Sequence, residues 1–229
     1  MAGQWAWLGA CADLCTAAAL PILARLPNLV PPAATPPSGP ARARSSGPLR
    51  RLITAYALLG FGYVVTATFI VAMARQQSSA PFIDALCWLV VGATAAPSVP
   101  LGHWLAKRYG SLAVMRGAFG LEALGVLLAG CGHSTLTLIA GGACLGATFL
   151  SITALIITLA RDAAGPAADA TVGWMTAAFG SGQLLGPFVA GRVAQWSGGF
   201  ALPSALAAGL LLVAAVVLPR NMAPAARPA

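Results

Sequence analysis

The segment Leu52–Arg75 constrains the fold most, because it runs for some two dozen residues with no charge before Arg75. A helix rises about 1.5 Å per residue, so a helix of this length crosses a bilayer core of about 30 Å. Tyr56, Gly60 and Tyr63 recur at steps of four and three, and therefore share one face of that helix. Small and hydroxyl-bearing residues on one face predict a membrane helix that packs against other helices.

The composition indicates an integral membrane protein. Hydrophobic residues make up 59% of the chain and charged residues 8%, whereas a soluble domain carries about 25% charged residues. So few charges cannot cover the surface of a soluble fold. The net charge of +8 does not indicate a nucleic-acid partner, because the cations are spread between apolar segments and form no dense basic face. Attraction to a membrane surface explains them instead.

The sequence predicts no cofactor and no catalytic residue. Its five cysteines mostly fall inside apolar segments, where a thiol behaves as a small buried hydrophobic group. Cys11 and Cys15 share a helical face, and Cys131 precedes His133 by two residues, but neither pair has the four-ligand spacing of a zinc site. We therefore expect no metal. Walker loops, dinucleotide fingerprints and paired membrane carboxylates are also missing from the sequence.

Apolar segments separated by short polar connections predict seven membrane spans. Their approximate bounds are Trp5–Ala24, Leu52–Arg75, Pro81–Ala106, Leu112–Cys131, Thr135–Ala160, Val172–Trp196 and Phe200–Leu218. The predicted domains are a first membrane helix over 1–26, a Pro- and Arg-rich cytoplasmic linker over 27–50, a six-helix bundle over 51–221 and a cytoplasmic tail over 222–229. Pro97 and Pro100 fall inside the third span and are expected to interrupt and kink it.

The positive charges orient these spans. If the linker is cytoplasmic and successive connections alternate sides, Arg75 and Arg192 lie outside. The other cations lie inside, namely Arg25, Arg42, Arg44, Arg50, Arg51, Lys107, Arg108, Arg116, Arg161, Arg220 and Arg227. The positive-inside rule then places the N-terminus outside and the C-terminus in the cytoplasm. An odd number of spans with an outer N-terminus predicts that the first span is the last helix of a longer first half.

Three stretches follow one another in the order GFGYVVTATFIVAMAR (Gly60–Arg75), GATFLSITALIITLAR (Gly146–Arg161) and MTAAFGSGQLLGP (Met175–Pro187). They resemble the seventh, tenth and eleventh helices of YbfB/YjiJ-like major facilitator transporters. The resemblance covers about Arg50–Leu218, with the Pro-rich linker in place of the family's central cytoplasmic loop. It implies an all-α multi-pass fold that corresponds to the C-terminal six-helix half of a transporter, preceded by a remnant of helix six.

The resemblance also implies a function. A major facilitator protein moves a small organic solute across a bacterial inner membrane by secondary active transport, with alternating access to a site near the midplane. The expected partners are the lipid bilayer, the solute, and a matching N-terminal half or a second copy. A non-transporting fragment, or a half that transports only when paired, stays open as an alternative. An intramembrane enzyme is disfavoured, because a rhomboid-like hydrolase needs Gly-x-Ser-Gly where this chain has Phe179-Gly180-Ser181-Gly182 and no later histidine.

Glycines predict close helix packing. The spacing of Gly173, Gly182, Gly186, Pro187 and Gly191 is similar to that of the superfamily's antiporter motif. Gly182 and Gly186 let two helix backbones approach closely, and Pro187 loosens the backbone hydrogen-bond ladder. An ordinary packing face with no bearing on antiport explains the same spacing. Gly142 and Gly146 form a second packing stripe of the GxxxG type.

Candidate solute-binding residues must be polar, lie within a span and share a face. Seven residues meet these conditions on the helices that line the central cavity in the resembling family: Tyr56, Tyr63, Thr66, Thr148, Ser151, Ser181 and Gln183. Taken singly, each hydroxyl has a simpler interpretation, which is a hydrogen bond to its own helix backbone or to a neighbouring helix.

Glu122 is the acidic residue nearest the middle of a span, and it is a candidate for proton coupling. A central charge costs about 2.5–3.5 kcal/mol, which a carboxyl group avoids by staying protonated or by finding a partner. The resemblance places the ninth helix outside the cavity-lining set. We therefore favour a protonated carboxyl that is hydrogen-bonded to a neighbouring helix, and keep proton coupling as the alternative.

Overall fold

The computed structural model describes residues 47–77 and 82–222. These residues form six α-helices and one short 3₁₀ turn, and no strand occurs among them. The elements are α2 (Gly47–Gln77), α3 (Ile83–Tyr109), α4 (Ser111–Cys131), α5 (Thr135–Ala164), η1 (Gly165–Ala167), α6 (Ala168–Ser197) and α7 (Ala201–Val217). The prediction of an all-α fold is confirmed for this part of the chain. The predicted first span and most of the predicted linker lie outside the described residues, so the count of seven spans stays a prediction.

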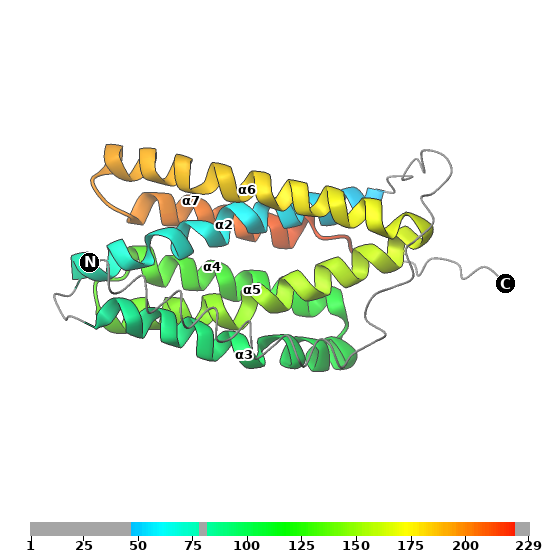
Figure 1. Cartoon of the computed structure of the whole chain (residues 1–229), viewed down its shortest axis with the longest axis horizontal. Coiled ribbons are helices and arrows are strands. Elements are labelled where there is room, and N and C mark those ends of the chain that lie inside the picture. The colour runs from blue at the N-terminus through cyan, green and yellow to red at the C-terminus, as the bar shows by residue number, and fades with distance from the viewer. Residues whose placement is uncertain (1–46, 78–81, 223–229) are drawn as a thin grey trace, which may run out of the picture. The chain divides into compact units, whose positions relative to one another are not determined.

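Consecutive helices run in opposite directions and are joined by short connections (Figure 1). α2 contacts all five of the other described α-helices. α3 packs mainly against α5, α6 mainly against α2, and α4 against both α5 and α7. A buried core forms where α2, α4, α5 and α7 meet, around Leu59, Phe119, Ile152 and Leu211. α2, α5 and α6 also contact one another pairwise, so side chains from these three helices can meet.

Four helical stretches among the described residues are long and apolar enough to cross a membrane: Gly47–Gln76, Ile83–Tyr109, Ser111–Cys131 and Thr135–Ser197. The last stretch contains α5, η1 and α6, and α7 is a shorter apolar helix. Most of the bounds predicted for the second to seventh spans agree with the ends of α2 to α7 to within a few residues. α2 begins before the predicted Leu52, at Gly47, because Pro48 lies in the first turn, where its missing N–H costs no helix hydrogen bond.

Pro97 and Pro100 do not interrupt α3, which corrects the predicted interruption of this span, whereas the predicted kink stays a prediction. The helix is continuous from Ile83 to Tyr109, and both proline side chains lie on its exposed side, where they displace no neighbouring helix. The Thr94 hydroxyl donates to the Val90 carbonyl (2.9 Å), and the Ser98 hydroxyl donates to the Ala95 carbonyl (2.8 Å). These bonds satisfy the hydroxyls within the helix itself, as is usual for Ser and Thr in membrane helices.

Glycines bring α6 close to α2. A Cβ added to Gly182 would overlap the Ala57 carbonyl oxygen and lie 2.7 Å from the Phe61 amide nitrogen, both of which are backbone atoms of α2. A Cβ on Gly186 would lie 2.5 Å from Val64 Cγ1 and 2.9 Å from the Phe61 carbonyl oxygen. Real Cβ atoms do not approach other atoms this closely, so only glycine fits at this helix contact.

α5 packs on α3 in a similar way. A Cβ on Gly146 would overlap the Val91 carbonyl oxygen and the Thr94 hydroxyl of α3. Gly142 lies one turn earlier on the same face, where a Cβ would be 3.3 Å from Val91 Cγ2. The two glycines therefore differ: Gly146 admits no side chain, whereas Gly142 is only tightly packed.

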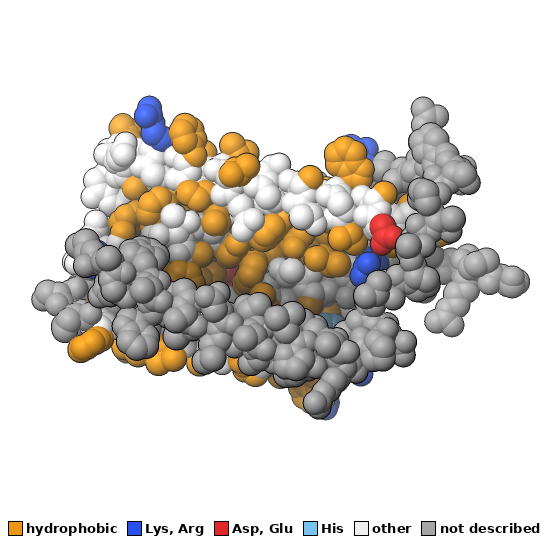
Figure 2. Space-filling view, viewed as in Figure 1, with side chains coloured by type: hydrophobic (Ala, Val, Ile, Leu, Met, Phe, Trp, Pro, Cys, Tyr) orange, Lys and Arg blue, Asp and Glu red, His pale blue; other side chains and the backbone are white. Residues whose placement is uncertain are grey.

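The charges are distributed unevenly between the two ends of the helices. The starts of α2, α4 and α6 and the ends of α3, α5 and α7 lie at one end (Figure 1). This cationic end carries Arg50, Arg51, Lys107, Arg108, Arg116, Arg161 and Arg220. The opposite end carries Arg75 and Arg192, and Arg75 is paired there with Asp84 (2.7 Å). On the visible face, apolar side chains cover the middle of the helices and Lys and Arg side chains lie toward their ends (Figure 2).

This asymmetry predicts the side of the membrane on which each end lies. In a variant without native cysteines, a thiol introduced by His133→Cys is expected to react with an impermeant reagent added outside intact cells. A thiol introduced by Ser111→Cys, at the other end of α4, is expected to react only after permeabilisation. The opposite pattern would reverse the proposed orientation. Position 133 is preferred to native Cys131, because Cys131 Sγ already contacts the Ala201 carbonyl oxygen (3.6 Å).

Candidate functional site

Four aromatic rings from three helices stack in the bundle. Tyr56 and Tyr63 lie seven residues apart on α2 and therefore point in the same direction. Phe179 of α6 stacks on both, with ring centroids 4.6 Å from Tyr56 and 5.7 Å from Tyr63. Phe149 of α5 stacks on Tyr63 at 4.2 Å. We call these four residues the aromatic cluster. It joins α2, α5 and α6 through flat apolar faces and two phenol groups.

Gln183 adds an amide to this cluster. It follows Phe179 by four residues on α6, which is one helical turn, so both side chains lie on the same face. Its Nε2 donates a hydrogen bond to the Tyr63 phenol oxygen. Tyr63 and Gln183 are both only partly buried. The Tyr63–Gln183 pair therefore offers polar groups that remain accessible within an otherwise apolar bundle.

Among the described residues, Ser181 and Thr66 form no hydrogen bond to the aromatic cluster. Ser181 is exposed on α6, and its hydroxyl donates to the Ala177 carbonyl one turn earlier (2.8 Å). This is the backbone bond that the simpler interpretation predicts. Thr66 is fully buried on α2, and its hydroxyl has no hydrogen-bond partner among the described residues.

Thr148 and Ser151 lie at a different place, on the face of α5 toward α3 and α4. They line a cavity of about 320 Å³ together with Ser98 and Gly102 of α3 and mostly apolar side chains of α4. Gly102 makes room there, because a Cβ at this position would overlap the Ser151 hydroxyl. The seven predicted residues are therefore not one constellation. We call this second place the α3–α5 cavity.

Glu122 lies beside Thr148 of the α3–α5 cavity. It is fully buried on α4, and its Oε2 is hydrogen-bonded to the Thr148 hydroxyl. The Thr148 hydroxyl also contacts the Cys144 carbonyl (2.6 Å). One hydroxyl proton cannot serve two acceptors, so a protonated carboxyl that donates to Thr148 completes both bonds. The second carboxyl oxygen of Glu122, Oε1, has no hydrogen-bond partner among the described residues.

The sequence reasoning missed Phe149, Phe179 and Ser98. Phe179 occurs in the quoted stretch MTAAFGSGQLLGP, four residues before Gln183, and that spacing is the signal that could have identified it. Phe149 directly follows Thr148, but an aromatic residue in an apolar span is too common to single out. Ser98 lies between two prolines, where a hydroxyl is more readily explained by backbone bonding.

Apolar helices of membrane length around partly buried polar side chains define a multi-pass helical membrane protein. The particular family follows from a comparison of the sequence with family models. The sequence-family model described as "Uncharacterised MFS-type transporter YbfB" matches residues 1–219, and the chain belongs to this family. The resemblance to YbfB/YjiJ-like transporters is thus confirmed, and the match also covers the predicted first span and linker. No curated protein sequence matches the chain.

Proposed function

We propose that this protein carries a small organic solute across the bacterial inner membrane by secondary active transport with alternating access. Membership of a family of major-facilitator-type transporters supports transport as the function. Within the bundle, the Tyr63–Gln183 pair is the observation that carries the proposal of a solute site, because it sets partly exposed phenol and amide groups beside stacked aromatic rings, the combination found in small-molecule sites. The N-terminus is proposed to lie outside and the C-terminus in the cytoplasm.

The chemistry of the aromatic cluster favours an uncharged or weakly charged solute. Its groups are four aromatic rings, two phenols and one amide, which bind flat apolar surfaces and single polar groups. No charged side chain stacks on or hydrogen-bonds to the cluster among the described residues. A strongly ionic solute would have to lose its hydration there without a counter-charge, which is costly.

The remaining predicted residues surround the proposed solute site or lie outside it. Tyr56 extends the aromatic wall toward the cationic end of α2, and Thr66 and Ser181 lie one helical turn or less from the Tyr63–Gln183 pair along their own helices. Thr148 and Ser151 line the α3–α5 cavity, and Thr148 links that cavity to Glu122. We propose that Glu122 has mainly a structural role and retain proton coupling as the alternative.

We also propose that the bundle works with a second half or a second copy of itself. A Cβ added to Gly173 or Gly180 of α6, or to Gly92 of α3, would meet no atom within 4 Å. Small residues on an outward membrane face allow another helix to approach closely. In the alternative, the chain transports nothing unless such a partner is present. Uptake by the chain alone and by the paired protein is compared to test both.

Loss of either member of the Tyr63–Gln183 pair is expected to weaken solute binding about tenfold. Tyr63→Phe and Gln183→Leu each remove a polar group and leave its partner unpaired, which costs about 1–3 kcal/mol. Binding is measured as the thermal stabilisation of purified protein by a panel of uncharged and weakly charged organic solutes. Thr54→Val, on the same helix but outside the cluster, is the matched control. Equal affinities for all three variants and the wild type would exclude this pair as the site.

A further inference from the structure

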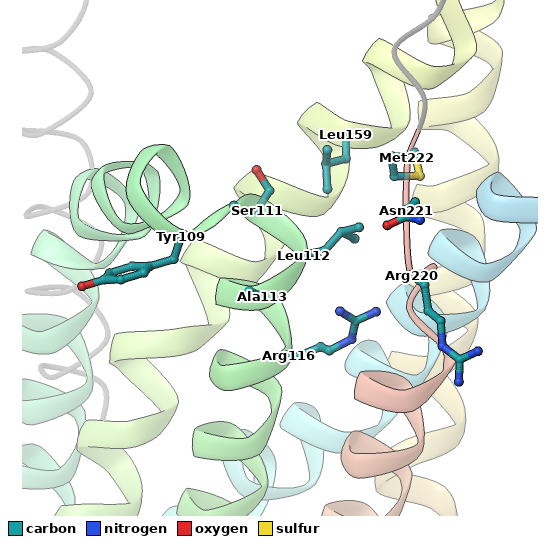
Figure 3. Close-up of a pocket in the computed structure, with 10 residues that line it drawn as sticks. Tyr109, Ser111, Leu112, Ala113, Arg116, Leu159, Arg220, Asn221 and Met222 are labelled. Carbon is teal, nitrogen blue, oxygen red and sulfur yellow. The ribbon is translucent and has the colours of Figure 1, made fainter.

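A larger cavity lies at the cationic end of the bundle, between the start of α4 and the segment that follows α7 (Figure 3). Its volume is about 590 Å³. Its polar lining comes from Tyr109, Ser111, Arg116, Arg220 and Asn221. No acidic side chain lines it among the described residues. We call it the end pocket. It is separate from the aromatic cluster and the α3–α5 cavity, and the proposed transport mechanism does not use it.

Arg116 is the central residue of the end pocket. It lies in the second turn of a membrane-length helix, and its side chain is directed from α4 toward the segment after α7 (Figure 3). Its Nη2 donates to the carbonyl oxygens of Leu218 (3.3 Å) and Pro219 (2.8 Å), at the end of α7. A guanidinium has five N–H donors, so the Nε and Nη1 donors remain for another acceptor.

Arg116 has no anionic partner within the described part of the chain. The salt bridges found there join Arg75 to Asp84 and Arg161 to Asp169, and neither includes Arg116. A half-buried cation in a membrane helix is costly unless it reaches the interface or meets an anion. The bonds to two neutral carbonyl oxygens satisfy part of the guanidinium but leave its charge uncompensated.

The surroundings of Arg116 strengthen the positive potential in the end pocket. Arg220 lines the opposite wall, is exposed, and has no acidic partner among the described residues. Lys107 and Arg108 lie in the last turn of α3, directly before Gly110 and the start of α4.

The end pocket is amphipathic and lies at the depth of lipid headgroups. Leu112, Leu159 and Met222 give it apolar walls beside the arginines. Because α4 is long and apolar enough to cross a membrane and α7 is a shorter apolar helix beside it, we place the ends where they meet near the membrane–water interface. Basic pockets between membrane helices on the cytoplasmic side, where we place the cationic end, are suited to anionic lipid headgroups.

We propose that the end pocket binds an anionic phospholipid through its phosphate group. Arg116 would donate to the phosphate with its remaining N–H groups, Arg220 would close over it, and the glycerol backbone would lie against Leu112 and Leu159. The bound lipid would bridge the start of α4 and the end of α7. This lipid site is independent of the transported solute, so it can be tested without knowing the substrate.

The test uses the full chain purified in a neutral detergent, with thermal unfolding followed by tryptophan fluorescence. Phosphatidylglycerol is expected to raise the unfolding temperature in a saturable way, whereas phosphatidylcholine with the same acyl chains is not. Arg220→Gln should weaken the apparent phosphatidylglycerol affinity roughly fivefold, which corresponds to the loss of one arginine at a membrane surface. Arg51→Gln, at the same end of the bundle but outside the pocket, should leave it unchanged.

Three results would overturn the proposal. Equal stabilisation by phosphatidylcholine would show that the lipid's charge is not recognised. An equal loss of phosphatidylglycerol affinity in Arg220→Gln and Arg51→Gln would show that the lipid is attracted by the whole basic surface and not by a site. Stabilisation by inorganic phosphate at the same concentration and to the same extent would assign the pocket to a free phosphate-bearing anion. Arg116→Gln also loses the hydrogen bonds to the Leu218 and Pro219 carbonyls, so this variant is expected to be less stable even without lipid. The comparison of Arg220→Gln with Arg51→Gln therefore tests the site.

Discussion

Gly182→Leu is expected to separate α6 from α2 and to lower the free energy of unfolding by about 3 kcal/mol, at the upper end of the usual cost of overpacking. The physical reason is that a Cβ at this position overlaps the Ala57 carbonyl oxygen and lies 2.7 Å from the Phe61 amide nitrogen. Both are backbone atoms of a helix, so no change of rotamer relieves the overlap. The measurement is the thermal unfolding temperature of the purified variant in detergent.

Gly209→Leu on α7 provides a control. A Cβ at Gly209 meets no atom within 4 Å, and leucine favours a helix more than glycine does, so this variant should be as stable as the wild type. Gly186→Leu should resemble Gly182→Leu, because Val64 and Phe61 of α2 occupy the space that its side chain needs. A Gly182→Leu variant with unchanged unfolding temperature would show that α2 and α6 are not packed as described.

Glu122→Ala is expected to cost about 2–5 kcal/mol of stability, as for other large-to-small changes in a core. Glu122 is fully buried, and its removal leaves both an empty space and a Thr148 hydroxyl without the carboxyl. Glu122→Gln should be close to wild type in thermal stability, because the amide has nearly the same shape and can donate to Thr148 in the same way.

The same Glu122→Gln variant separates the structural role from proton coupling. A glutamine cannot ionise, so near-normal proton-driven uptake by the variant is expected, in a complete transporter that contains this half, if Glu122 only completes the bonds around Thr148. The measurement compares proton-driven accumulation with solute exchange, which needs no net proton movement. Loss of accumulation with exchange intact would contradict the structural role and identify Glu122 as the coupling residue.

The helices of this bundle could be predicted well because membrane spans are defined by length and polarity. The connection Gly132-His133-Ser134 ends one predicted span at Cys131 and starts the next at Thr135, and both bounds agree with α4 and α5. Ser134 caps α5 by accepting a hydrogen bond from the Thr137 amide (3.2 Å). The predicted interruption of α3 at its prolines was wrong, because the effect of a proline depends on whether its ring faces a neighbouring helix or the exposed side.

The site could be predicted only in part. Periodicity shows which residues share a face of one helix, but not which other helix that face meets. Tyr63 and Gln183 are 120 residues apart, and only the packing of α6 on α2 brings them together. Thr148 and Ser151 satisfied the same criteria as these two residues, yet their face of α5 points toward α3 and α4.

Uptake by proteoliposomes tests the central claim most directly, which is that this bundle forms part of a solute pathway. The chain is reconstituted alone and together with a matching N-terminal half from a family member, with solutes chosen for thermal stabilisation. We predict uptake by the paired protein above protein-free liposomes and none by the chain alone. Gln183→Ala should lower the paired uptake to background, while Thr54→Val should preserve it. Equal uptake by Gln183→Ala and wild type, or no uptake of any stabilising solute by the paired protein, would contradict the account.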